Sequence, residues 1–246
     1  LGILISAGIA GFIQWRANRQ AKFLQEFGQE VARIEGTMRI AHLLPLHDIQ
    51  PEKKQVVQSL DRLQKEMENL GTVAYGPGHY SLGRGYLALQ QYQTAYEHLF
   101  KAWNDYEYRI PAVEYSLGYS LAMLYHEKLK EAAQTIGKSQ LSYKKEQLKK
   151  TYRDPALEYI RGSNFTSEAA QYVAALLAFF SKDYTDSLRY SDETIKKFPA
   201  FYEAQTLQGD IYKAIGDERR DTGKLMEAET FYSKAKEAYL AAAKKG

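Results

Sequence analysis

The sequence contains no cysteine, only six prolines and no strong excess of either charge. Without cysteine there is no disulfide framework, no thiolate metal site and no cysteine nucleophile, and the redox compartment stays open. Few prolines leave few forced breaks, and 20 tyrosines with ten phenylalanines favour helices that pack through aromatic side chains. A net charge of +3 is too small to indicate a nucleic-acid surface. The composition predicts a mainly helical protein that does not bind nucleic acid.

An uncharged apolar run occupies residues 1–13 and is followed by Trp15 and Arg16. A membrane-spanning helix needs about 20 apolar residues, so the run is too short unless it is only part of a span. We expect residues 1–15 to be the C-terminal part of a truncated transmembrane helix, with Trp15 and Arg16 at the interface. A buried helix or the tail of a secretory signal is the alternative.

Residues 16–71 are expected to form a membrane-proximal helical hairpin. Apolar residues recur at helical spacing from Phe23 to Ala41 and again from Val56 to Leu70, and Pro45 and Gly71 end the two stripes. The same spacing also suits a coiled coil between two chains, so a homodimer stays open as an alternative.

From residue 72 onward, small and large apolar residues recur in a regular order. Leu82-Gly83 is repeated as Leu117-Gly118 after 35 residues, and Ala175 and Gly209 fill the glycine slot in a third and a fourth copy. Small residues at this slot let two antiparallel helices approach closely, and neighbouring pairs must stack to bury their apolar faces. We therefore expect an all-α fold of helical-hairpin repeats stacked as a superhelix over residues 72–246.

Two parts of this repeat region are irregular. In the second copy Pro111 opens the first helix and Ala132 belongs to the second, which places a turn between Gly118 and Ala132. An insert at about residues 140–167 is expected to form one charged helix and one short helix that begins at Pro155. Its basic run, YKKEQLKK, is interpreted as a solvated helix face, with contact to anionic lipid headgroups as the alternative.

No catalytic, cofactor-binding or metal site is predicted. The five histidines show no ligand spacing, and His126-Glu127 is followed by Lys130 where a zinc-protease helix would have its second histidine. We expect the histidines to serve packing or to lie at the surface.

The first helices of successive repeats should line a concave face. Tyrosine and arginine are enriched at binding hot spots because they combine contact area with a polar group. We predict a protein or peptide partner on this face, although many of its tyrosines could instead pack between repeats. The candidate residues are Tyr80, Arg84, Tyr115, Tyr119, Met123, Tyr172, Phe179, Asp210 and Lys213.

The repeats resemble the tetratricopeptide family over residues 76–243. In the first copy the family's Leu-Gly, Tyr, Ala and large-residue slots are occupied by Leu82-Gly83, Tyr86, Ala95 and Leu99. The resemblance implies a non-catalytic fold that binds protein partners.

The order of several segments resembles a more specific group. The chain is similar to the region that follows the kinase domain in bacterial transmembrane serine/threonine protein kinases. The resemblance lies in the order of an apolar run, QWRANRQAKFLQEFGQEV, GPGHYSLGRGYLALQQYQTAY, DPALEYIRGS and GDIYKAIGDERRDTG. The chain itself carries no kinase signature. The resemblance implies a sensory or interaction module in the bacterial cytoplasmic membrane, single-pass, with periplasmic repeats. The alternative is a free-standing membrane-anchored scaffold for an envelope or secretion complex.

Overall fold

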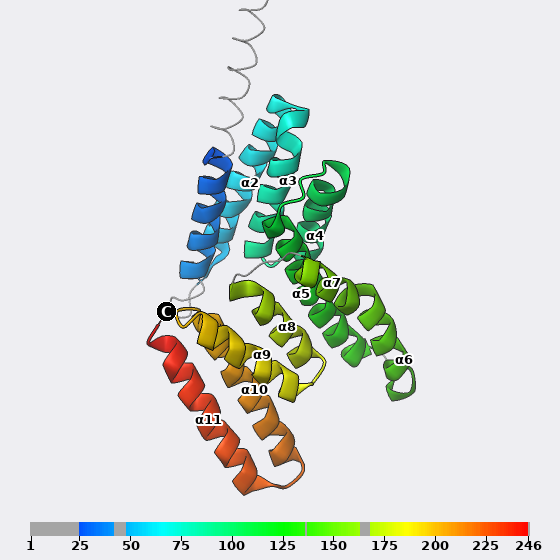
Figure 1. The fold of residues 1–246 in the computed structure, drawn as a ribbon, viewed down its shortest axis with the longest axis vertical. Helices are drawn as coiled ribbons and strands as arrows, with labels where there is room; N and C mark the ends of the chain where they lie inside the picture. The colour runs from blue at the N-terminus through cyan, green and yellow to red at the C-terminus, as the bar shows by residue number, and fades with distance from the viewer. Residues whose placement is uncertain (1–24, 42–47, 136, 163–167, 246) are drawn as a thin grey trace, which may run out of the picture. The chain divides into compact units, whose positions relative to one another are not determined.

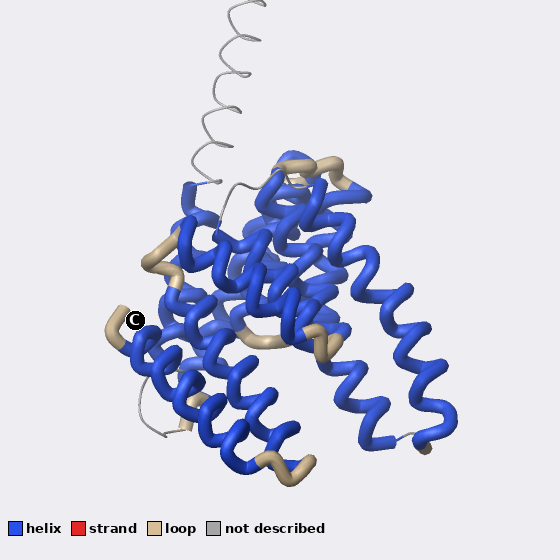
Figure 2. Tube along the Cα trace, turned by 60° about the horizontal axis from the view of Figure 1, so that its bottom comes forward, coloured by secondary structure: helices blue, strands red, loops and turns tan. Residues whose placement is uncertain are grey.

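The computed structural model describes residues 25–41, 48–135, 137–162 and 168–245, and every regular element within these ranges is helical (Figure 1). The predicted all-α fold of helical hairpins is confirmed. The chain divides into two compact units, Leu1–Ser120 and Leu121–Gly246, and the boundary falls within one long helix. Most of the connections between consecutive helices are short turns (Figure 2).

The first unit is built on a core shared by several helices. Buried side chains of the helix over residues 25–41, including Phe27 and Ile34, cluster with Val56, Leu60 and Leu82. The apolar stripes of the sequence therefore face one another. After that first helix, the elements of this unit are α2 (Gln50–Leu70), α3 (Thr72–Ala88), α4 (Tyr92–Phe100), the π-helix η1 (Lys101–Asp105) and the first part of α5 (Pro111–Thr135).

The second unit continues from α5 with further helices. They are α6 (Lys138–Leu148), the π-helix η2 (Lys149–Arg153), α7 (Asp154–Gly162), α8 (Glu168–Phe180), α9 (Tyr184–Lys197), α10 (Tyr202–Asp221) and α11 (Leu225–Ala243). Helix α8 packs against α9, and α10 packs against both α9 and α11, so two hairpins lie side by side (Figure 1).

The α3–α4 hairpin closes on Gly83. A β-carbon at this position would lie only 2.5 Å from Cγ of Leu99 on α4, and Leu82, Ala95 and Leu99 are fully buried around it. The glycine is therefore needed for close approach of the two helices, as the repeat pattern predicts.

The α8–α9 hairpin uses a serine for the same purpose. The Ser187 hydroxyl on α9 is buried and donates a hydrogen bond of 2.8 Å to the backbone carbonyl of Ala175 on α8. The turn before α9 places Lys182 at φ 63°, and the Asp183 carboxylate accepts a 3.1 Å hydrogen bond from the backbone N–H of Asp186. This N-cap fixes where α9 begins.

The α10–α11 hairpin repeats one contact twice. Gly209 lies against the ring of Tyr239, and Gly216 lies against the ring of Tyr232. Each tyrosine hydroxyl then donates a hydrogen bond to the aspartate that follows its glycine, at 2.7 Å for Asp210 and 2.9 Å for Asp217. The two Gly-Asp pairs thus clamp α11 onto α10.

The second repeat corrects a prediction. A turn was expected between Gly118 and Ala132, but α5 runs unbroken from Pro111 to Thr135. After Gly118 this stretch contains no glycine or proline and is rich in strong helix formers, so its intrinsic propensity sustains the helix. The second helix of this hairpin is therefore α6, which begins at Lys138.

The predicted single-pass membrane location is wrong for the part of the chain that the structure describes. Within residues 25–41, 48–135, 137–162 and 168–245, no helix combines the length and the apolar character needed to cross a membrane. The apolar run at residues 1–13, on which that prediction was based, lies outside the described residues.

Replacing Gly83 by alanine should destabilise the protein by about 1–3 kcal/mol, because the added methyl group overpacks the contact with Leu99. The matched control is Gly28→Ala in the exposed part of the first helix, where a β-carbon meets nothing within 4 Å. That change should stabilise by about 0.5–1 kcal/mol because alanine is the better helix former. Urea denaturation followed by circular dichroism measures both, and an equal response of the two variants would contradict the close-approach role of Gly83.

Candidate functional site

A hollow in the second unit is lined by the first helices of three hairpins together with α6 and η2. Helices α5, α8 and α10 are the first helices of the α5–α6, α8–α9 and α10–α11 hairpins, and all three line a space of about 460 Å³. We name this space the first-helix hollow. Its size falls within the range of ligand-binding clefts.

Five aromatic residues line the first-helix hollow. This aromatic floor consists of Tyr125, His126, Phe179, Phe180 and Tyr184. The ring centroids of His126 and Phe180 lie 4.1 Å apart in a stacked arrangement, and Phe179 lies 6.0 Å from Phe180. Tyr125 is buried, whereas the other four are half-buried and present part of their surface to the hollow.

Lysines surround the aromatic floor. This lysine rim consists of Lys130 on α5, Lys145 on α6, Lys149 on η2 and Lys182 in the α8–α9 turn. Lys149 pairs with Glu146 at 3.1 Å and Lys182 pairs with Glu218 at 3.0 Å. Among the described residues, Lys130 and Lys145 form no ion pair, so their charges are directed to solvent.

Glu218 of α10 holds one edge of the hollow in place. Its carboxylate accepts hydrogen bonds from Lys182, at 3.0 Å, and from the Tyr184 hydroxyl, at 3.1 Å. Burial and the Glu218 charge raise the pKa of Tyr184 to about 12. Burial, then the Lys130 charge, lower the pKa of His126, which disfavours the charged form of this ring.

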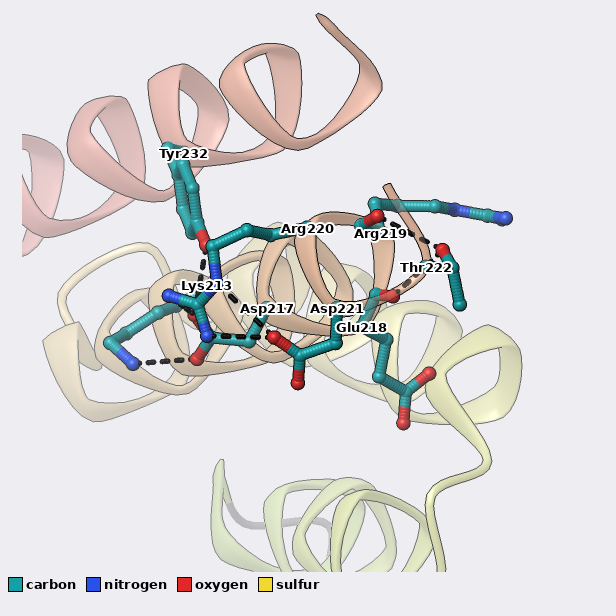
Figure 3. A network of polar contacts seen from close by, with 8 residues as sticks. All are labelled: Lys213, Asp217, Glu218, Arg219, Arg220, Asp221, Thr222 and Tyr232. Carbon is teal, nitrogen blue, oxygen red and sulfur yellow. Dashed lines mark hydrogen bonds and ion pairs between the residues drawn. The ribbon is translucent and has the colours of Figure 1, made fainter. Parts of the chain in front are cut away.

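The end of α10 carries a network of charged side chains (Figure 3). Asp217 accepts hydrogen bonds from Lys213, at 2.8 Å, and from the Tyr232 hydroxyl, at 2.9 Å, and these bonds lower its pKa. Arg220 lies 3.4 Å from Asp217 and 3.0 Å from Asp221. The network links α10 to α11, and within it the Lys213 charge is paired with the Asp217 carboxylate.

The residues that the sequence nominated for binding are divided between the two units. Tyr80, Arg84, Tyr115 and Tyr119 belong to the first unit, and Met123, Tyr172, Phe179, Asp210 and Lys213 belong to the second. Of these, only Phe179 lines the first-helix hollow.

Several of the nominated side chains have partners inside the protein. Arg84 donates two hydrogen bonds to the Glu35 carboxylate, at 2.8 Å and 2.6 Å. The ring of Tyr172 meets Phe201 edge-on at 5.1 Å, and Tyr115 and Tyr119 lie with centroids 6.3 Å apart. Their role in binding stays a prediction.

Sequence reasoning missed the lysine rim and most of the aromatic floor. The run YKKEQLKK was interpreted as a solvated face, although it supplies Lys145 and Lys149. The expected turn inside α5 also hid the fact that His126 and Lys130 continue the first helix of the repeat. The available signal was the absence of any helix breaker after Gly118.

A pair of histidines lies in the core of the α3–α4 hairpin. The Nδ1 atoms of His79 and His98 are 2.8 Å apart, so one imidazole donates a hydrogen bond and the other accepts it. Tyr106 stacks on His79 with centroids 5.3 Å apart, and Tyr86 stacks on His98 at the same distance. In the described residues no group of three potential ligands surrounds a metal position, so this pair is a hydrogen-bonded contact between α3 and α4.

Comparisons with known proteins give limited information. No family model matches the chain, and no curated protein matches its sequence. Among solved structures, the crystal structure of MamA aligns with 81% of this chain and 99% of its own, at 17% identity and a TM-score of 0.46. A likeness this distant says nothing about function. The helical-hairpin architecture rests on the helix packing described above.

The histidine pair should make stability fall in mild acid. Burial, then the charges of His98 and Lys101, lower the pKa of His79 to about 4, against a partial opposite effect of Asp105. Burial and Lys101 also lower the pKa of His98, opposed by Glu97. A histidine with a depressed pKa contributes stability that is present above the unfolded-state pKa near 6.5 and is lost as pH falls toward 4. We expect a loss of roughly 2–4 kcal/mol between pH 7 and pH 4.

The control is His79→Phe, which keeps an aromatic ring but removes one titrating group. Carboxylate protonation also destabilises proteins in acid, so the informative quantity is the difference in unfolding free energy between wild type and variant at pH 7 and at pH 4. This difference should shrink at pH 4. A difference that does not change with pH would show that the pair does not titrate in this range.

Proposed function

We propose that the chain is a non-catalytic interaction module that binds a peptide or protein partner through the first-helix hollow. The observation that carries the proposal is that α5 and α8, the first helices of two hairpins, supply half-buried aromatic side chains to one hollow, which α10 also lines through Ala214. Half-buried aromatic side chains in a concave site supply large contact area with little loss of conformational entropy. The charged network at the end of α10 is satisfied internally, which leaves the hollow as the better candidate surface.

Site-specific photocrosslinking tests this function directly. Ala133 is exposed and lines the hollow, so p-benzoylphenylalanine at this position should capture a partner of discrete mass in cells of the natural host. The matched control places the same residue at Ala243, which is exposed at the end of α11 and does not line the hollow. Adducts at both positions, or at neither, from folded protein would contradict the proposed function.

A finer proposal concerns the parent protein. The order of sequence segments supports a role as the region that follows the kinase domain of a bacterial serine/threonine protein kinase, with a free-standing scaffold as the alternative.

The intact mass and N-terminal peptide map of the native protein distinguish the kinase proposal from the scaffold alternative. The kinase proposal expects a product larger than 28.1 kDa with kinase signature motifs ahead of Leu1. A product without those motifs would contradict the kinase proposal and leave the scaffold.

A further inference from the structure

The aromatic floor has the geometry of a receptor for an apolar side chain. Phe179 and Phe180 present half-buried rings to the first-helix hollow, and Tyr184 lies 6.2 Å from Phe179 at its edge. An aromatic or long aliphatic group placed here would stack on rings that are already fixed by their neighbours, so little ordering entropy would be lost. The 460 Å³ of the hollow exceeds the volume of one side chain, which leaves room for flanking backbone.

The charges around the floor select for acidic neighbours of that side chain. Four rim lysines face one lining carboxylate, that of Glu146. Lys130 and Lys145 form no ion pair within the part of the chain that the structure describes. A partner carboxylate would therefore gain attraction without first breaking an internal ion pair.

The basic surface continues beyond the hollow. Residues 140–153 of α6 and η2 contain five basic side chains against one acidic, a larger excess than the net +3 of the whole chain. On its other side α6 borders a second hollow of about 660 Å³, where the described lining residues include Lys128, Lys144 and Lys150 and one carboxylate, that of Glu131. Acidic residues on both sides of an anchored side chain would thus meet lysines.

We infer that the first-helix hollow binds an acidic peptide segment that inserts one bulky apolar side chain onto the aromatic floor. This inference rests on the proposed function and adds the chemistry of the partner. A peptide fits because the half-buried rings and the unpaired lysines line the same hollow, so one segment contacts both through an apolar side chain and its acidic neighbours.

Selection from a phage-displayed library of random 12-residue peptides, with the full chain as bait, tests the inference. Enriched sequences should share an aromatic or leucine residue flanked by aspartate and glutamate. Synthetic peptides of this pattern are then titrated by fluorescence anisotropy. The double change Lys130→Glu and Lys145→Glu should weaken binding about tenfold or more, because two attractive charges become repulsive.

A matched control makes the same charge change elsewhere. Lys196 on α9 and Lys236 on α11 are exposed and do not line either hollow, so Lys196→Glu with Lys236→Glu should bind the peptides as the wild type does. Peptides with lysine in place of their acidic residues should bind the Lys130→Glu, Lys145→Glu protein better than the wild type. Circular dichroism confirms that all variants fold.

Other outcomes overturn the inference. Selected peptides that are basic or neutral, or that bind both double variants equally, would contradict the inference of an acidic segment. They would not contradict the interaction function, which the photocrosslinking experiment tests separately. Failure to enrich any peptide would also overturn the inference. Binding to phosphatidylglycerol vesicles that is lost in the Lys130→Glu, Lys145→Glu protein, without peptide binding, would assign the basic surface to anionic lipid.

Discussion

Close approach of the two helices in the α3–α4, α8–α9 and α10–α11 hairpins is the constraint on which the structure depends. Gly83 admits Leu99 between α3 and α4, and Ser187 of α9 bonds directly to the α8 backbone. Gly209 and Gly216 admit the rings of Tyr239 and Tyr232 between α10 and α11. In each contact one helix carries a small residue, and atoms of the partner helix occupy the space beside it. This arrangement gives the dense packing of a protein interior.

This pairing explains why a binding surface forms on the first helices. When the small residues face the partner helix, other faces of the same helix are left for neighbouring hairpins and for solvent. In the second unit α5, α8 and α10 turn such faces toward the first-helix hollow, and the Glu218 bonds to Lys182 and Tyr184 fix the turn at its edge. The same helix packing thus stabilises the fold and positions the aromatic floor.

The repeat architecture could be predicted from sequence because its determinants are local. The spacing from Gly83 to Leu99 and the turn at Asp183 specify helix pairs through periodicity and capping. The length of α5 was mispredicted because the repeat register suggested a turn, whereas the residues after Gly118 favour a helix. The lysine rim and the His79–His98 contact escaped prediction because they join residues on different helices, and the local sequence does not specify which side chains of different helices come together.

The central claim is that a partner's carboxylates contact the lysine rim. A zero-length carbodiimide crosslinker joins carboxylates to lysine amines that are in direct contact, so applied to the natural complex it reports the partner's position. The account predicts crosslinks from acidic residues of the partner to Lys130 and Lys145. Crosslinks confined to lysines of α11, such as Lys236, or to the first unit would contradict it.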